Sequence, residues 1–324
     1  MLQTQFSKLF DLEVPVLQAA IWPATAPELV AAVSEAGGLG SVGAVFGSAE
    51  QIVEQMRRVR ALTQRPFVVN HVVPLLDEAA FQATLDEPPA AVSFALGDPG
   101  PLVERVHAAG AKVIHQVHTV RQAREAAQRG VDVLIAQGSE AGGQGMVACA
   151  GTMALVPQVV DAVQPIPVLA AGAVADGRGL AAALVLGAAG VNVGTRFLAS
   201  VEAGADEQWK QRIVEVESEE TVRFEAWSTI MPAGGGSYDV VPRVIRTDFV
   251  ATWEGRPDEV RQQAEALRGQ IVASLQEGRP HDLTPFTGQS AGLIHDVRPA
   301  AEIVRALGRG AEQALERTAA LRTA

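Results

Sequence analysis

Eight short apolar segments, separated by stretches with helical periodicity, are the feature that most constrains the fold of this chain. The predicted strands span residues 14–20, 39–44, 66–72, 91–96, 112–117, 133–138, 167–173 and 190–197. The predicted helices between them span residues 26–36, 49–62, 75–85, 99–109, 120–129, 152–163 and 177–186. Apolar strands joined by helices indicate an α/β fold whose parallel sheet is buried on both faces. Eight such units favour closure into a (β/α)8 TIM barrel.

An open, doubly wound sheet is the alternative arrangement of the same elements. Dinucleotide-binding sheets of this type carry a G-x-G-x-x-G motif directly after the first strand. The residues after position 20 contain no such motif. The barrel is therefore the favoured prediction.

The regular alternation ends after Phe197. Helical stretches at 207–220 and 258–276 follow, and a last amphipathic helix is expected at 299–320. Aromatic residues such as Trp209 and Trp227 can form an apolar core in the intervening segment, which argues against a disordered linker. We predict a barrel formed by residues 1–204 and 290–324, with a small lobe of residues 205–289 inserted after strand 8. Residues 231–238 within the lobe are interpreted as either a mobile flap or a solvent loop.

Composition excludes several classes of function. The chain has 324 residues and a formal charge of −11, so nucleic acid is not an expected partner. Cys149 is the only cysteine, which rules out an internal disulfide, and no spacing suggests a metal site. The longest apolar run, 180–194, is too short to cross a membrane, and charged residues near the N-terminus argue against a signal peptide. We expect a soluble, cytoplasmic protein, with a homodimer possible.

Small residues recur at the ends of the last two predicted strands, at 171–173 and 194–195. Without bulky side chains, backbone N–H groups from both strand ends can approach one phosphate. The loops after strands 7 and 8 are where barrels of this type bind phosphate. A further buried strand–helix–strand repeat with no binding role is the alternative interpretation.

Residues 136–143 read AQGSEAGG, the most specific motif of the chain. This segment, followed in order by 153–158, 171–179, 194–197 and 288–294 and preceded by 66–70, resembles the nitronate monooxygenase (2-nitropropane dioxygenase) family. The similarity covers nearly the whole chain. It implies an FMN-binding TIM barrel that is related to the flavin-dependent enoyl-ACP reductases and quinone reductases.

The resemblance also implies which residues bind FMN. They are Ala19, Ala20, Ile21, Asn70, Gln137, Gly138, Gly142, Gly143, Gly172, Ala173, Asn192, Val193, Gly194 and Thr195. The first three would lie against the isoalloxazine ring, Asn70 and Gln137 would hydrogen-bond to it, and those from Gly172 onward would hold the phosphate. Ala173 stands where relatives have a second glycine, and its methyl group disfavours a positive φ.

Gln144 is the main departure from the family pattern, because relatives that oxidise nitro compounds carry a histidine after the two glycines. An imidazole titrates near neutral pH, whereas an amide cannot take up a proton there. Gln144 can still donate a hydrogen bond to a substrate oxygen. We therefore expect Gln144 to serve substrates that arrive already ionised, such as alkyl nitronates, and neutral nitroalkanes to react poorly.

His115 and His118, at the end of the fifth predicted strand, are candidates for the missing catalytic group, and His71 follows Asn70. Carboxyl ends of barrel strands are where catalytic residues lie. Alternation along the strand places His115 and Val117 on one face and Gln116 on the other, so not all of these side chains can point inward. A structural role is the alternative for each histidine.

Three classes of function remain open. The first is an FMN-dependent oxidase or monooxygenase that acts on an alkyl nitronate or a similar small anion with O2. The second is an NAD(P)H-dependent reductase of a quinone or an enoyl thioester. The third is a specialised or inactive flavin-binding homologue. The resemblance favours the first, with a small molecule as the substrate.

Overall fold

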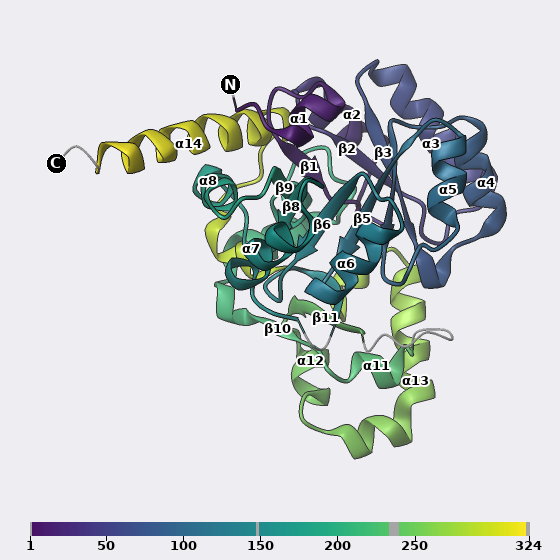
Figure 1. Ribbon diagram of the computed structural model, residues 1–324. Helices are drawn as coiled ribbons and strands as arrows, with labels where there is room; N and C mark the ends of the chain where they lie inside the picture. The colour runs from purple at the N-terminus through teal and green to yellow at the C-terminus, as the bar shows by residue number, and fades with distance from the viewer. Residues whose placement is uncertain (1, 147–148, 233–239, 322–324) are drawn as a thin grey trace.

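Eight parallel strands form one sheet in the computed structural model, which describes residues 2–146, 149–232 and 240–321 (Figure 1). The strands are β1 (Val16–Gln18), β2 (Gly40–Gly43), β3 (Phe67–Val72), β4 (Ala91–Ala95), β5 (Lys112–Val117), β6 (Val133–Gln137), β8 (Val168–Ala171) and β9 (Gly190–Val193). Their order is β1-β9-β8-β6-β5-β4-β3-β2. All eight lie within the segments predicted from the sequence.

The sheet closes on itself between its first and last strands. Leu17 and Leu39 form a parallel bridge, in which the Leu39 N–H donates to the Val16 carbonyl and the Gln18 N–H donates to the Leu39 carbonyl, each at 2.9 Å. A closed sheet leaves no unpaired edge. The predicted TIM barrel is confirmed, and the doubly wound alternative is excluded.

Helices surround the barrel. They are α2 (Pro27–Glu35), α3 (Ala49–Leu62), α4 (Glu78–Asp86), α5 (Leu102–Ala108), α6 (Val120–Gln128), α7 (Thr152–Val163), α8 (Gly177–Val185) and α14 (Ala300–Ala320). The last of these, α14, packs against both α8 and α2 and thereby completes the ring, although it comes after the inserted segment in the chain. Its C-terminal end projects away from the barrel (Figure 1).

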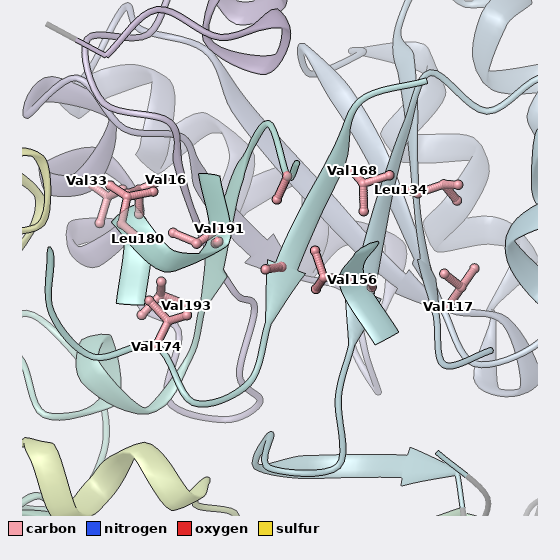
Figure 2. Close-up of a cluster of buried hydrophobic side chains, with 14 of the residues drawn as sticks. Val16, Val33, Val117, Leu134, Val156, Val168, Val174, Leu180, Val191 and Val193 are labelled. Atoms are coloured by element: carbon pink, nitrogen blue, oxygen red, sulfur yellow. The ribbon is translucent and has the colours of Figure 1, made fainter. Parts of the chain in front are cut away.

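Apolar residues pack on both sides of the barrel wall. Alternate strand residues such as Val16, Val168 and Val191 face outward and pack against the helices (Figure 2). The other set, including Leu17, Ile114 and Leu169, fills the inside of the barrel. This division follows from the two-residue period of a strand that is buried on both faces.

The short helix α1 (Gln5–Phe10) plugs the amino-terminal end of the barrel. Phe6 and Phe10 belong to the same apolar cluster as the inward-facing strand residues, and Phe6 is completely buried. Thr4 caps the helix, and its hydroxyl also donates to the Ala189 carbonyl at 2.6 Å. This plug is not predicted from the sequence. Within the described ranges it leaves the carboxyl end of the barrel open to a ligand.

Residues after β9 build a small lobe over that open end. It contains α9 (Thr195–Leu198), α10 (Glu207–Glu215), β10 (Thr221–Arg223), α11 (Trp227–Ile230), β11 (Val240–Ile245), α12 (Asp248–Trp253), α13 (Pro257–Gln276) and 3-10 turns at Ser218–Glu220, Pro280–Asp282 and Gln289–Leu293. A further 3-10 turn, Val73–Leu75, follows β3 in the barrel. A cluster that includes Phe224, Trp227 and Leu267 forms a separate core in the lobe. The predicted boundaries at residues 205 and 289 stay a prediction.

One strand of the lobe comes from the barrel itself. The strand β7 (Gly143–Met146), which follows β6, pairs antiparallel with β11, and β11 pairs antiparallel with β10. The loop after β6 is therefore shared between the two parts of the molecule. No helix in the described ranges combines the length and the apolar composition of a membrane-spanning segment.

Three buried histidines lie on or just after β3 and β5. His71 and His115 lie behind the barrel wall, whereas His118 Nε2 lies 3.5 Å from Nε2 of Gln116, a residue of β5. His71 Nε2 lies 3.1 Å from Thr84 Oγ1 on α4, and His115 Nδ1 donates to the Phe94 carbonyl at 3.1 Å. His118 is only 2% exposed. Burial disfavours the charged imidazolium and lowers the pKa of each of the three to about 4. All three are therefore neutral at pH 7.

We expect acidification to destabilise the protein through these histidines. Their folded pKa of about 4 lies below the ordinary value of 6.5, so between these pH values the unfolded chain binds more protons. The stabilisation is complete above pH 6.5 and is lost as the pH falls toward 4. Each histidine accounts for about 2 kcal/mol of unfolding free energy between pH 6.5 and 4.5.

Urea denaturation of the wild type and His71→Leu at pH 7 and pH 4.5 measures this loss. The variant should lose less unfolding free energy on acidification than the wild type. His295→Leu, at an exposed position, is the control and should behave as the wild type does. An equal loss in the wild type and His71→Leu contradicts the assignment.

Candidate active site

A cavity of about 430 Å³ opens at the carboxyl end of the barrel, under the lobe. Strand ends from β1 to β9 supply its floor, and lobe residues such as Trp227, Leu275 and Phe286 supply part of its wall. This volume is within the range of pockets that hold a cofactor or a drug-sized ligand. The position matches the end of the barrel where the sequence placed the site.

Uncharged polar side chains form the floor of the cavity. They are Gln18, Ser41, Asn70, Ser93, Gln116, Gln137 and Asn192. Asn70 Nδ2 donates to Ser93 Oγ at 2.8 Å, and Gln18 Oε1 accepts the Ser41 N–H at 2.9 Å. Asn192 Oδ1 is buried and has no hydrogen-bond partner among the described residues. A buried acceptor of this kind favours a ligand that carries a hydrogen-bond donor.

Gln137 connects the floor to the lobe. Its Nε2 donates to the Gln144 carbonyl at 3.2 Å, and its side chain is 7% exposed. Gln144 lies in β7, where it is held opposite Pro242 of β11. The Gln137 amide N–H therefore supports the strand that carries Gln144, and both residues line the same cavity.

The ends of β8 and β9 form one side of the cavity. Gly172 and Ala173 both have positive φ angles, +102° and +60°. The methyl group of Ala173 was expected to disfavour a positive φ. Ala173 nevertheless adopts this conformation. The chain turns sharply here between the end of β8 and Asp176, which caps α8. A turn of this type presents backbone N–H groups that can bind an anion.

Thr195 joins this region to the end of the lobe. Its Oγ1 accepts the Gly288 N–H at 3.0 Å, and the neighbouring Gln289 N–H donates to the Glu140 carbonyl at 2.9 Å. Trp209 Nε1 also donates to Thr287 Oγ1 at 3.1 Å. Residues 287–289 are therefore fixed by three hydrogen bonds, two to the segments that follow β9 and β6 and one to α10.

Close backbone packing explains two of the predicted glycines. A Cβ on Gly138 would lie 2.2 Å from Thr152 Oγ1, and one on Gly142 would lie 2.5 Å from the Gly288 nitrogen. Gly194 differs, because a Cβ there would meet nothing closer than Ile21 Cδ1 at 3.6 Å. The fold therefore requires glycine at the first two positions but does not require it at Gly194.

Most of the predicted site residues lie together. The cavity is lined by Ala19, Ala20, Ile21, Asn70, Gln137, Gly142, Gly143, Gln144, Gly172, Ala173, Asn192, Gly194 and Thr195. Gly138 and Val193 are not part of the lining. Val193 faces outward into the helix-packed core, as alternation with Asn192 requires.

The structure does not bring the candidate histidines to the cavity. His115 shares the outer face of β5 with Val113 and Val117, which pack against helices, and His71 and His118 are likewise absent from the lining. Gln116 is the residue of β5 that reaches the site. Gln116 lies two residues after the inward-facing Ile114, so strand alternation predicts that it faces inward as well. A search for titratable side chains alone misses this residue.

No charged or histidine side chain appears among the described residues that line the cavity. The described part of the chain also has no cluster of three or more histidine, cysteine, aspartate or glutamate residues that could hold a metal ion. Of the predicted flap at 231–238, Met231 and Pro232 line the cavity and the rest lies outside the described residues.

Comparison with known proteins identifies the family. The nitronate monooxygenase profile matches residues 3–85 and 79–310. A probable nitronate monooxygenase of Staphylococcus saprophyticus is 34% identical over 345 aligned residues, which cover 90% of this chain and 93% of the relative. FabK from Thermotoga maritima is similar in structure, with a TM-score of 0.89 and 32% identity over 99% of this chain and all of FabK. Nitroalkane oxidase from Streptomyces ansochromogenes has a TM-score of 0.81 and 28% identity, over 97% and 99% of the two chains. The chain belongs to the nitronate monooxygenase family and is a flavin-dependent oxidoreductase.

Proposed function

We propose that this protein binds FMN and oxidises alkyl nitronates with O2. The observation that carries the proposal is the absence of a titratable side chain among the described residues of the cavity lining. A neutral nitroalkane needs a base to remove its α-proton, whereas a nitronate has already lost it. A lining whose described residues include no base therefore suits the nitronate.

The residues of the cavity fit an FMN molecule. The small residues Ala19 and Ala20 leave room for a flat ring, and the unpartnered Asn192 Oδ1 can accept a hydrogen bond from it. Asn70 and Gln137 lie at the same end of the barrel and would orient the ring. The strand ends at Gly172–Ala173 and Gly194–Thr195 would hold the phosphate through backbone N–H groups, without help from a lysine or arginine of the described lining.

The side chains of the cavity bind and orient the substrate. The flavin supplies the redox chemistry when it is bound. Gln144, fixed on β7, can donate an amide N–H to a nitronate oxygen, and Gln116 offers a second amide on the floor. Neutral donors that are already in place stabilise negative charge without moving during the reaction.

Reduction of a neutral substrate by NAD(P)H is the second candidate function. The described residues of the cavity wall are uncharged and largely apolar, which favours a neutral hydride acceptor over an anion, since an anion loses hydration on entry. The similarity to FabK supports the same alternative. Both functions use the same flavin site. They differ in which substrate reduces the flavin.

Gly194→Ala tests the placement of the flavin. The added methyl group meets only ordinary contacts in the protein, at 3.6 Å or more, so the fold should tolerate it. In the proposed complex it intrudes on the FMN, and overpacking of about 1–3 kcal/mol corresponds to a loss of roughly 5- to 150-fold in affinity. Titration of the apoprotein with FMN, followed by quenching of flavin fluorescence, measures the affinity.

Gly204→Ala is the matched control for this substitution. Its nearest contact would be the Ala24 carbonyl at 3.5 Å, and it does not line the cavity. It should bind FMN as the wild type does. Equal FMN affinity in Gly194→Ala and Gly204→Ala would place the flavin elsewhere.

Anaerobic mixing of the flavin-loaded protein with one reductant at a time separates the two functions. Under the proposal, an alkyl nitronate bleaches the flavin absorbance and admission of air restores it, while NADH and NADPH have no effect within seconds. Rapid bleaching by a nicotinamide nucleotide, with none by the nitronate, would replace the proposal with the reductase alternative.

Gln144→His tests the missing base. The wild type should turn over neutral nitroalkanes poorly, and an imidazole at this position should raise that rate by about a hundredfold, the lower end of the usual range for general base catalysis. Initial rates of O2 consumption with a nitroalkane and with its nitronate measure the gain. Gln144→Leu, which loses the amide without adding a base, should show no gain on the nitroalkane. No gain in Gln144→His would show that the lack of a base at residue 144 does not limit the reaction.

A further inference from the structure

Phe46 combines two features that a protein normally avoids. Its side chain is 64% exposed, and its backbone has a φ of +57°, the left-handed region that side chains disfavour. Gly47 stands next to it, and glycine adopts positive φ without this penalty, yet Phe46 takes the conformation. Strained, exposed apolar residues of this kind are found at functional sites.

The loop that carries Phe46 is fixed at both ends. Ala44 N–H donates to the Asn70 carbonyl at 2.9 Å, and Ser48 caps α3 in a reciprocal capping box with Gln51. The Phe46 ring lies against the Trp22 ring, with centroids 5.2 Å apart and planes at 71°. This is the edge-to-face geometry that aromatic rings prefer. Phe46 is therefore held in a defined place beside Trp22.

Both rings line the cavity, and apolar residues extend the surface that they begin. Leu75 and Leu96 continue it along the ends of β3 and β4, and Leu75 is 41% exposed. Trp227 and Leu275 of the lobe line the cavity as well. Most of the polar side chains belong instead to the strand ends on the floor, and Gln144, Thr284 and Ser290 are the polar residues that the lobe side adds. The cavity is thus polar on the floor of the barrel and mainly apolar in the surrounding loops.

We propose that Trp22 and Phe46 form a subsite for the apolar tail of the substrate. The substrate class is amphiphilic: a small polar head that reacts on the floor of the barrel, and an unbranched alkyl tail that covers the exposed face of Phe46. This inference deepens the proposed function, because it names the kind of molecule that the same cavity takes. Contact with the tail removes the exposed face of Phe46 from water, which favours binding. The ring is exposed in the free protein because it is the surface that the substrate covers.

Two homologous series of unreactive ligands test the subsite on the flavin-loaded protein. The n-alkyl carboxylates from acetate to octanoate carry a planar anionic head, and the n-alkanols of the same lengths carry a neutral one. Perturbation of the flavin absorbance gives the dissociation constants. In the wild type, each methylene that reaches the subsite should tighten binding by roughly fourfold in at least one series.

Phe46→Asn removes the ring but keeps a residue that tolerates a positive φ, so the loop should keep its conformation. Its gain per methylene should fall to less than twofold. Val185→Asn, at a position 71% exposed on α8 and outside the cavity lining, is the matched control and should keep the wild-type gain. Thermal melting of both variants shows whether they are folded.

Absence of any dependence on chain length in the wild type, including absence of binding in both series, overturns the subsite. Retention of the full gain in Phe46→Asn overturns it as well. A chain-length dependence that Phe46→Asn abolishes supports it, even if nitronates fail to bleach the flavin. In that case the proposed reaction fails and the subsite stands.

Discussion

Pairing between β7 and β11 is the interaction on which the site depends. It draws four residues of a barrel loop into the sheet of the lobe and thereby sets the position of Gln144. Gln137 Nε2, on the barrel floor, donates to the Gln144 carbonyl of the same strand at 3.2 Å. Backbone hydrogen bonds in a sheet leave little freedom to the residues between them. Gln144 is therefore placed by the lobe and the barrel together.

The sequence predicted the barrel well, because its signal is local. Each strand is a continuous apolar run, and each helix has its own period and stop signal, so every unit can be recognised without knowledge of its neighbours. The small residues at Gly172 and Gly194 were also recognisable beside strand ends, and both line the cavity, while phosphate binding there stays a prediction. The plug formed by Phe6 was not, because six residues of helix carry too little periodicity to reveal what they pack against.

The site was predictable only in part. Motif resemblance identified the residues that line the cavity, but it gave no direction for side chains near strand ends. His115 and Gln116 are neighbours in the chain, and the two-residue period of β5 sends one behind the wall and the other into the cavity. The pairing of β7 depends on residues almost one hundred positions away, at Val240–Ile245, and no local pattern reports such a contact. The contact between Trp22 and Phe46 also joins two separate loops, so no local sequence pattern predicts it.

The position of α14 has a consequence for how the chain is made. This helix fills the gap between α8 and α2, and Gly177 and Gly310 approach so closely that a Cβ on Gly177 would lie 2.3 Å from the Gly310 carbonyl carbon. On the ribosome, α2 and α8 emerge long before α14, and the whole lobe is synthesised between them. The lobe core at Phe224 and Leu267 can form while one side of the barrel is still uncovered. The surfaces of α2 and α8 that α14 covers therefore stay exposed in the nascent chain until α14 has been synthesised.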